Sequence, residues 1–481
     1  MTGQGYGAAE IVDAIEVGQS SSWRQWAAEI VLSVALFHAA IAFPQVAGWL
    51  VLLSLVFLLR LRRALTLRRA FYGGLLVGVG IMGPQLLFFW KLFSVFSVAL
   101  WFMLGIWFGI FVVLGKLVER RFGRGWGVAA APFLWMGLEF IRCEVWPLKF
   151  AWLTPGFVLP PEGWAGSFYC LGIYGTGGLL VYAAAWVADT SRGAVKWVLP
   201  AVLPAGMIGL PAANPGAGPA KTIAVAGVQW EDPLPSQVIE SLDEALKRAP
   251  ESQLIVLSEY TYQTEPPPEL KAWCQRNRVH VLVGGVDRHV SEHLEEERVY
   301  NTAFLVGPDG KIALKQVKSV PIQFMNDGLP ARRQRLWDSP VGKVGIAICY
   351  DMNYARVMDR LIAREAELLV IPAMDVVNWG PHAHRLSAQL AGVRAAEYGV
   401  PLFRLASSGF SRIVLPDGRI AKELGVPGQG EIISERIALP GKGRRPFDRW
   451  LLWPCVGLTV GLMGFLIYEE LGRRRAAGVP R

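Results

Sequence analysis

The feature that most constrains the fold of this chain is a series of long apolar runs within its first 212 residues. A helix that crosses a bilayer needs about 20 mostly apolar residues. On that criterion we predict seven spanning helices in this region and an eighth near the end of the chain. The predicted spans are 26–43, 46–60, 70–90, 92–117, 125–141, 166–188, 196–212 and 450–468. No early run is followed by a small-residue cleavage site, so we expect the first span to remain as an anchor.

The composition agrees with a membrane protein. Apolar residues make up 53% of the 481 residues and charged residues only 18%, which excludes a disordered chain and is unusual for a soluble enzyme. The formal net charge is +9, and much of it lies between apolar runs, which indicates a membrane and not a nucleic acid as partner. Five cysteines without a CxxC pair argue against a zinc ribbon or a disulfide framework.

The placement of basic residues predicts the topology, because cytoplasmic loops are rich in Lys and Arg. Basic residues gather after the second, fourth and sixth spans, at Arg60, Arg62, Arg63, Arg68, Arg69, Lys116, Arg120, Arg121, Arg124, Arg192 and Lys196. The alternate loops are poorer in net positive charge. We therefore expect both termini in the cytoplasm and the segment after the seventh span outside it.

That segment, 220–448, changes in character after a Pro/Ala/Gly stretch at 211–220 that we interpret as a linker. Short β-type runs alternate with helical stretches, which predicts a layered α/β domain with helices outside a mostly buried sheet. The predicted strands are 223–228, 254–257, 279–283, 302–306, 344–348, 368–371, 402–405 and 413–415, and the predicted helices are 236–248, 268–277, 355–365 and 384–398. PDG at 308–310 and at 416–418 predicts hairpin turns.

The predicted domains are a membrane domain of about seven spans at 1–212, an extracytoplasmic domain at 220–448, and a final helix with a basic cytoplasmic tail at 450–481.

Three segments of the 220–448 domain place a reactive side chain just beyond an apolar run. Glu259 follows LIVLS, Cys349 follows VGIAI, and Lys318 lies between them after a predicted hairpin. Strand ends are where α/β sheets usually build their sites. A Cys makes an acyl-enzyme once a base removes its proton, and an ammonium stabilises an oxyanion. Taken singly, each residue has an ordinary structural reading as a core thiol, a capping carboxylate or a solvated charge.

The ordered set resembles the nitrilase superfamily. Glu259, Lys318 and Cys349 occur in that order with separations of 59 and 31 residues, and Cys-Tyr-Asp follows a predicted strand. In the membrane portion, PFLWMGLEFIRCEVW at 132–146 resembles the P-x-x-W-x-x-x-E-W-x-R segment of bacterial apolipoprotein N-acyltransferases. YCLGIYGTGGLL at 169–180 resembles the span that follows in that family. The resemblance covers nearly the whole chain.

The resemblance implies an α-helical transmembrane bundle joined to an αββα nitrilase-like sandwich on the periplasmic side of the bacterial inner membrane. It implies that Glu259 is the base, Lys318 the oxyanion stabiliser and Cys349 the nucleophile. The implied reaction moves a fatty acyl group from a phospholipid, through a Cys thioester, to the N-terminal amine of a diacylglyceryl-cysteine lipoprotein. No cofactor and no metal are expected.

Near the lysine, the sequence departs from the family pattern K-x-x-L-V-P-F-G-E. An ungapped alignment from Lys318 matches Phe324 but puts Asn326 at the glutamate position, with Asp327 adjacent as a possible substitute. Lys315 is the competing candidate for the oxyanion role.

Several further residues have two readings. Tyr350 and Asp351 match the family's Tyr-Glu pair, and Asp351 could simply orient the chain after the nucleophile. Trp379, like Phe324 and Met325, would line an acyl pocket or belong to the core.

The sequence also leaves open the role of three pairs of polar residues. His382 and His384 form an H-x-H that we read as a pocket loop more readily than as a metal site. Glu139 and Arg142 near a membrane boundary are either functional or a structural pair. We expect Arg394 and Glu397 to form an i,i+3 surface or interface pair.

Two other functions remain open on the residues alone. A membrane-tethered amidase or nitrilase-type hydrolase would use the same triad and let water take the acyl group. A membrane scaffold with a degenerate enzyme domain is a different class, and the intact Glu259, Lys318 and Cys349 argue against it.

Overall fold

The computed structural model describes residues 21–189, 198–212, 221–290 and 297–476. The chain divides into two compact units, which we describe separately. A helical unit comprises Met1–Pro160, Tyr174–Met207 and Asp448–Arg481, and an α/β unit comprises Pro161–Ile173 and Ile208–Phe447. Arg192, Lys196 and all but the first two residues of the predicted linker lie outside the described residues.

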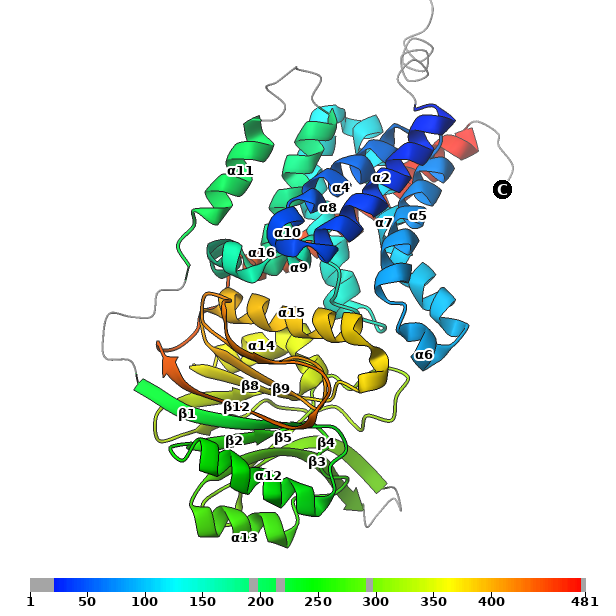
Figure 1. The fold of residues 1–481 in the computed structure, drawn as a ribbon. Coiled ribbons are helices and arrows are strands. Elements are labelled where there is room, and N and C mark those ends of the chain that lie inside the picture. The colour runs from blue at the N-terminus through cyan, green and yellow to red at the C-terminus, as the bar shows by residue number, and fades with distance from the viewer. Residues whose placement is uncertain (1–20, 190–197, 213–220, 291–296, 477–481) are drawn as a thin grey trace, which may run out of the picture. The chain divides into compact units, whose positions relative to one another are not determined.

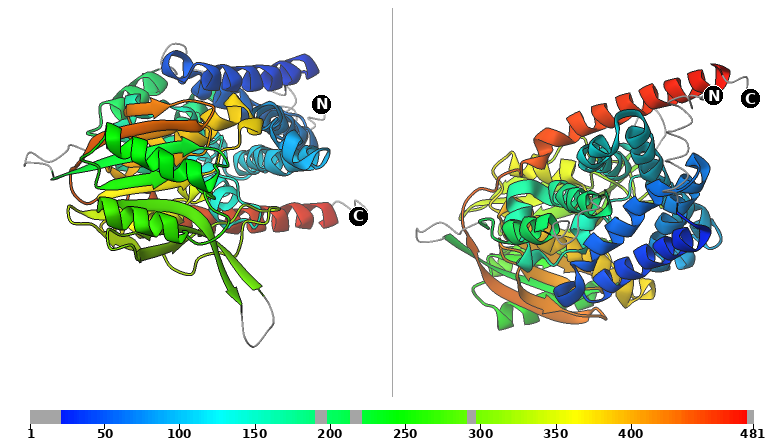
Figure 2. Two further views of the ribbon diagram at one scale, coloured as in Figure 1. Left: turned by 60° about the horizontal axis from the view of Figure 1, so that its bottom comes forward. Right: turned by 90° about the horizontal axis from the view of Figure 1, so that it is seen from above.

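Every predicted span contains a helix (Figure 1). The helices are α2 (Trp23–Ala42), α3 (Pro44–Ala47), α4 (Leu50–Arg60), α5 (Leu67–Gln85), α6 (Phe89–Phe93), α7 (Phe96–Phe122), α8 (Arg124–Phe140), α9 (Pro155–Val158), α10 (Ala165–Asp189), α11 (Val198–Ile208) and α16 (Asp448–Ala476). Figure 2 shows α16 as one long continuous helix. Its last turns include the basic residues that we predicted as a tail.

Four of the described helices are long and apolar enough to cross a membrane: α2, α7, α10 and the Asp448–Gly472 part of α16. By contrast, α4 and α11 have 11 residues each. At 1.5 Å per residue such a helix is about 16 Å long, well short of a hydrocarbon core of about 30 Å. The described chain therefore carries four helices that could span a membrane by length and composition, while the total of eight crossings stays a prediction.

A buried ion cluster joins the ends of three helices of the helical unit. Nη1 of Arg62, just after α4, lies 2.7 Å from Glu119 near the end of α7, and Nη2 lies 2.5 Å from Asp189 at the end of α10. Lys116 Nζ donates to the carbonyl oxygen of Arg62 at 3.0 Å. These residues belong to the loops predicted to be cytoplasmic, or to the helix ends beside them. Their clustering agrees with those loops sharing one side of the unit.

The α/β unit consists of two six-stranded sheets with helices on their outer faces (Figure 1). The first sheet has the order β12-β1-β2-β3-β4-β5 and the second β11-β10-β9-β8-β7-β6. The strands are β1 (Lys221–Trp230), β2 (Leu254–Leu257), β3 (His280–Val290), β4 (Glu297–Val306), β5 (Ile312–Val317), β6 (Leu336–Asp338), β7 (Lys343–Ile346), β8 (Leu368–Ala373), β9 (Leu402–Ala406), β10 (Ser411–Val414), β11 (Ile420–Leu424) and β12 (Gln429–Leu439). Helices α12 (Pro235–Arg248) and α13 (Pro268–Asn277) cover the first sheet, and α14 (Ala355–Ile362) and α15 (Pro381–Tyr398) cover the second. This is the predicted αββα sandwich.

Side-chain alternation along β1 shows how the layers are held together. Ile223 and Val225 point toward the second sheet and join a core with residues such as Val344 and Phe403. Ala226 and Val228 point the other way and pack in the core beneath α12 and α13. A strand buried on both faces reads as a short continuous apolar run, which is why these central strands could be predicted from the sequence.

Four strands were missed by the sequence prediction: β5, β6, β11 and β12. They lie at or beside the sheet edges, where side chains are partly exposed and polar residues interrupt the apolar pattern. Both predicted hairpins are confirmed, since β4 pairs with β5 across Gly307–Lys311 and β10 with β11 across Leu415–Arg419. The β3–β4 ribbon, visible in Figure 2, extends well beyond the rest of its sheet.

Candidate active site

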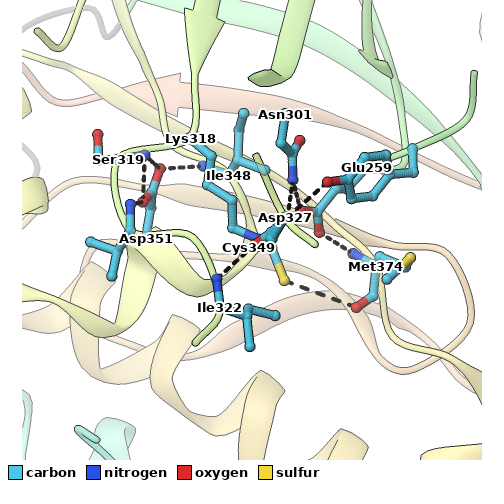
Figure 3. Close-up of polar contacts among 12 residues, drawn as sticks. Glu259, Asn301, Lys318, Ser319, Ile322, Asp327, Ile348, Cys349, Asp351 and Met374 are labelled. Carbon is cyan, nitrogen blue, oxygen red and sulfur yellow. Dashed lines mark hydrogen bonds and ion pairs between the residues drawn. The ribbon is translucent and has the colours of Figure 1, made fainter. Parts of the chain in front are cut away.

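The three predicted residues Glu259, Lys318 and Cys349 converge at one place in the α/β unit (Figure 3). Lys318 Nζ lies 2.8 Å from Oε1 of Glu259 and 2.7 Å from Oδ2 of Asp327. Glu259 and Lys318 are buried and Cys349 is half-buried. The three follow β2, β5 and β7, which belong to two different sheets. The site is thus formed where strand ends of both sheets meet.

Glu259 is held by the backbone around it and by three hydrogen bonds. The buried strand β2 ends at Leu257, and Gly284 of β3 passes so close that a Cβ there would lie 2.5 Å from the Glu259 Cα. The carboxylate accepts from Lys318 Nζ, from Asn301 Nδ2 at 2.6 Å, and at its other oxygen from the Met374 backbone N–H at 2.8 Å. A carboxylate accepts about four hydrogen bonds, so these contacts leave capacity for a thiol proton.

Lys318 is a fixed positive charge. Burial by itself lowers its pKa, but the neighbouring Glu259, Cys349 and Asp327 outweigh burial and raise the pKa of Lys318 well above its ordinary value. Its backbone is fixed by an N–H···O bond to Asn301 at 2.8 Å. A buried ammonium between two carboxylates stays protonated, as an oxyanion stabiliser must.

Cys349 begins a short 3-10 helix, Cys349–Asn353, directly after β7 and two connecting residues. Its φ is +47°, a conformation that a residue with a side chain rarely adopts and that often occurs at functional sites. The thiol donates to the Met374 carbonyl at 3.9 Å. Burial, followed by the charge of Glu259, raises the pKa of Cys349 well above its usual value. The resting thiol therefore keeps its proton, and attack requires a base.

Asp351 orients the turn that carries the nucleophile. Its buried carboxylate accepts from the backbone N–H groups of Ser319 (2.9 and 3.0 Å to its two oxygens), Val320 (2.7 Å) and Ile348 (3.2 Å). Burial raises its pKa to about 6, although these hydrogen bonds oppose the shift. Asp351 thus fastens the Cys349 turn to the segment that follows Lys318, which agrees with the orienting role considered above.

Asp327, and not Asn326, stands beside the lysine. Asn326 is exposed, whereas Asp327 is buried and accepts from the Tyr260 hydroxyl at 2.8 Å, from Asn301 Nδ2 at 2.7 Å and from the Ile322 N–H at 2.8 Å. Lys318 and these donors lower its pKa despite burial. The structure therefore places the carboxylate of Asp327, and not the side chain of Asn326, beside the ammonium of Lys318.

Lys315 lies elsewhere. It is part of β5, its side chain is about one-third exposed, and it forms ion pairs with Glu265 and with Asp287, the latter at 3.1 Å. Lys318 is thus the lysine of the site.

Comparisons with known proteins divide the chain into a helical part and an α/β part, as the structure does. The sequence model described as Carbon-nitrogen hydrolase matches residues 222–440, and the model described as Apolipoprotein N-acyltransferase N-terminal domain matches residues 34–186. Together they account for most of the chain. Over most of its length the chain is therefore similar to apolipoprotein N-acyltransferases. It contains a nitrilase-superfamily domain at 222–440 and a helical part that matches the N-terminal domain of these acyltransferases.

Individual relatives show how far the similarity extends. The chain is 26% identical to the apolipoprotein N-acyltransferase of Azotobacter vinelandii over 406 residues, which are 74% of this chain and 72% of the relative. It is 28% identical to that of Pseudomonas aeruginosa over 216 residues, 40% of each chain. It is 23% identical to the deaminated glutathione amidase of Dictyostelium discoideum over 172 residues, 32% of this chain and 59% of that one. The matches thus span less than two thirds of the latter two relatives.

Among solved structures, the chain is similar to Nit3 of Saccharomyces cerevisiae, a member of branch 10 of the nitrilase superfamily. The identity is 23%, the match covers 45% of this chain and 90% of that chain, and the TM-score is 0.39.

Sequence reasoning missed three contributors to the site. Asn301 bridges Glu259 and Asp327, Tyr260 donates to Asp327, and the peptide of Met374 contacts both Glu259 and Cys349. An amide directly before the apolar run Thr302–Val306 was an available signal for Asn301. Met374 contributes only backbone atoms, so its residue type carries no signal.

The remaining predicted residues lie around this centre or apart from it. Phe324 is exposed with φ +67°, Tyr350 packs edge-on against Tyr354, and Trp379 is half-buried in the turn before α15. Their role in an acyl pocket stays a prediction.

The two histidines of the H-x-H lie in different surroundings. His384 is buried with Nε2 2.9 Å from the Val376 carbonyl, and His382 is exposed. Within the described ranges, no group of three His, Cys, Asp or Glu is placed to hold a metal ion.

The structure also places the two remaining polar pairs, Glu139 with Arg142 and Arg394 with Glu397. Glu139 accepts from Trp135 Nε1 at 3.0 Å, and Arg142 donates to the Trp152 carbonyl at 3.3 Å, so each has a partner of its own. Arg394 and Glu397 form the expected i,i+3 ion pair, and because both are buried it is an interface pair and not a surface pair. One side of α15 packs on β9 and β10, while the Cys349–Asn353 turn covers another.

Proposed function

We propose that this enzyme transfers a fatty acyl group from a phospholipid to the N-terminal amine of a diacylglyceryl-cysteine lipoprotein through a thioester on Cys349. The observation that carries the proposal is the convergence of Glu259, Lys318 and Cys349 in a chain that also matches the N-terminal domain of apolipoprotein N-acyltransferases. The convergence supports acyl transfer chemistry, and the helical unit supports a lipid as donor.

In the first half-reaction, Glu259 removes the proton of the Cys349 thiol as the sulfur attacks the ester carbonyl of the phospholipid. The carbonyl oxygen gains negative charge, which the fixed ammonium of Lys318 stabilises. The carbon–oxygen ester bond then breaks, and the leaving lysophospholipid oxygen takes the proton from Glu259. The products are a lysophospholipid and a thioester on Cys349.

In the second half-reaction, the lipoprotein amine attacks the thioester and Glu259 accepts a proton from the attacking nitrogen. The carbon–sulfur bond breaks, and the proton returns to the Cys349 sulfur. The products are an amide and the free thiol, so no external oxidant, reductant or cofactor is required. Cys349 holds its proton at rest, so the first half-reaction requires a base. The carboxylate of Glu259 is the base there and accepts the amine proton in the second half-reaction.

The proposed location is the bacterial inner membrane, with 220–448 on the periplasmic side. The Lys and Arg asymmetry of the loops supports this orientation. The meeting of Arg62, Glu119 and Asp189 at one end of the helical unit supports it further, since these residues belong to loops, or helix ends beside them, assigned to the same side.

The second candidate is a membrane-tethered carbon–nitrogen hydrolase. It is favoured by the match of 222–440 to the carbon-nitrogen hydrolase family and by the similarity to a relative named as an amidase. The same residues would act, with water in place of the amine.

The deciding experiment incubates the purified enzyme with phospholipid vesicles and a diacylated lipopeptide. Mass spectrometry then measures the N-acylated lipopeptide and the free fatty acid. The transferase predicts N-acylated product in stoichiometric balance with lysophospholipid. Free fatty acid that forms at the same rate with and without the lipopeptide would instead identify a hydrolase.

A further inference from the structure

Two buried charges of α15, Arg394 and Glu397, lie outside the catalytic trio. Both are almost completely inaccessible, and Nη1 of Arg394 lies 2.5 Å from Oε2 of Glu397. A buried ion pair is by itself weak support for stability, because desolvation of the two charges offsets their attraction. The other contacts of the pair therefore indicate what it does.

Arg394 holds the far end of the nucleophile turn. Its Nε donates to the Met352 carbonyl at 2.9 Å and its Nη2 donates to the Asn353 carbonyl at 2.6 Å. These two carbonyls end the Cys349–Asn353 turn. A planar guanidinium fixes several acceptors in one geometry, and a strained residue such as Cys349 persists only where its surroundings determine its conformation.

Glu397 connects Arg394 to a second segment of the chain, at Ile173. Its Oε1 accepts from the backbone N–H of Ile173 at 3.0 Å. Ile173 directly follows Gly172, whose φ of +76° and ψ of 173° interrupt α10, so a new helical segment begins at Ile173. The first N–H groups of a helix lack intrahelical acceptors and carry partial positive charge, which favours a carboxylate at this position.

We propose that the Ile173 N–H, Glu397 and Arg394 form a positioning link within the α/β unit that fixes the Cys349 turn to the backbone of Ile173. The link is continuous: the N–H binds one carboxylate oxygen, the other oxygen binds the guanidinium, and the guanidinium binds the two turn carbonyls. The geometry of the nucleophile then depends on the backbone at Ile173, which belongs to the same α/β unit as Glu397, Arg394 and Cys349. The effect on turnover rests on the proposed function, whereas the effect on Cys349 itself does not.

The backbone donor can be removed with one substitution, Ile173→Pro. Proline lacks the N–H and is tolerated in the first helical position. The preceding residue, Gly172, already has the extended ψ that proline favours before it. Ile173→Ala is the matched control because it keeps the N–H while removing more side-chain atoms than proline does, so it bounds the effect of lost packing.

Both variants are compared as full-length protein in detergent with phospholipid. The readouts are the rate of alkylation of Cys349 by iodoacetamide, located by peptide mass spectrometry, and the rate of N-acylation. We expect Ile173→Pro to change the alkylation rate and to lower kcat by at least about tenfold with little change in KM, because a displacement of about 1 Å can lower a rate by about 100-fold. Ile173→Ala should resemble the unmodified enzyme in both.

Glu397→Gln and Arg394→Lys provide a second test if Ile173→Pro does not fold. Glu397→Gln keeps the shape but loses the charge that binds Arg394, and Arg394→Lys loses the fork that binds two carbonyls. Both should alter Cys349 alkylation in the folded protein. Unchanged alkylation in these folded variants, or equal rates for Ile173→Pro and Ile173→Ala, would overturn the link. Altered alkylation in an enzyme that never N-acylates would keep the link and refute the proposed function instead.

Discussion

Lys318 and Asp327 form a buried ion pair with 2.7 Å between Nζ and Oδ2, although the family pattern expects a glutamate one position earlier. The carboxylate is shorter by one methylene than glutamate and sits one residue further along the chain. Its additional contacts to Tyr260 and Asn301 hold it in place. The ammonium of Lys318 thus has two carboxylate partners, Glu259 and Asp327.

Substituting Asp327 should impair the enzyme, and substituting its neighbour should not. Asp327→Asn removes the charge that helps to fix Lys318, and we expect N-acylation to fall by at least about tenfold, the scale of one lost charge-assisted hydrogen bond. Asn326→Ala is the control and should retain nearly full activity, because Asn326 is exposed. An inactive Asn326→Ala variant would restore the ungapped alignment.

The two lysines should differ sharply. Lys318→Met removes the proposed oxyanion stabiliser and should lower the N-acylation rate by about 100-fold or more, equivalent to about 3 kcal/mol. Lys315→Met removes a partly exposed ion pair of β5 and should lose little. Rates are measured at equal amounts of folded protein. A dead Lys315→Met variant beside an active Lys318→Met variant would reverse the assignment.

Substitution of Glu259 should affect thiol reactivity and catalysis in opposite directions. Its charge helps to raise the pKa of Cys349, so Glu259→Gln should lower that pKa and increase thiolate at neutral pH. Iodoacetamide alkylation of Cys349 at about pH 7.5 should then accelerate by up to about tenfold for each unit by which the pKa falls. N-acylation should nevertheless be lost, because the base is gone. Normal accumulation of the thioester in this variant would show that Glu259 is not the base.

Cys349→Ser should abolish turnover without unfolding the protein, because a serine hydroxyl requires much stronger activation than a thiol. Cys170→Ser is a suitable control, since Cys170 is also half-buried but contacts the Pro211 carbonyl instead of the site. Mass spectrometry of enzyme incubated with phospholipid should detect an acyl adduct on Cys349 in the control and none in Cys349→Ser. An adduct on another cysteine would relocate the nucleophile.

The orientation can be tested in intact cells with a membrane-impermeant amine reagent. Exposed lysines of the α/β unit, such as Lys247 and Lys442, should react once the outer barrier is permeable. Lysines that react only after the inner membrane is opened would place 220–448 in the cytoplasm and contradict the positive-inside argument.

The sequence alone predicted the sandwich and its central strands, because strands buried on both faces appear as continuous apolar runs. It also predicted Glu259, Lys318 and Cys349 as site residues, since the order and spacing resemble a known superfamily, and the structure brings the three together. It failed at the edges, as β12 shows: exposed polar residues interrupt its pattern, yet it pairs with β1 along its whole length.

Only the tertiary structure decided which residues support the trio. Asp327, and not Asn326, lies beside Lys318 because the loop path, which no local pattern encodes, brings that carboxylate there. Met374 takes part through its peptide, which is identical for most residue types. Arg394 and Glu397 have the spacing of an ordinary surface pair on a helix, and they are buried because the Cys349 turn, 41 and more residues away in sequence, covers them. Contacts between distant segments depend on packing, and sequence periodicity describes only the segment in which it occurs.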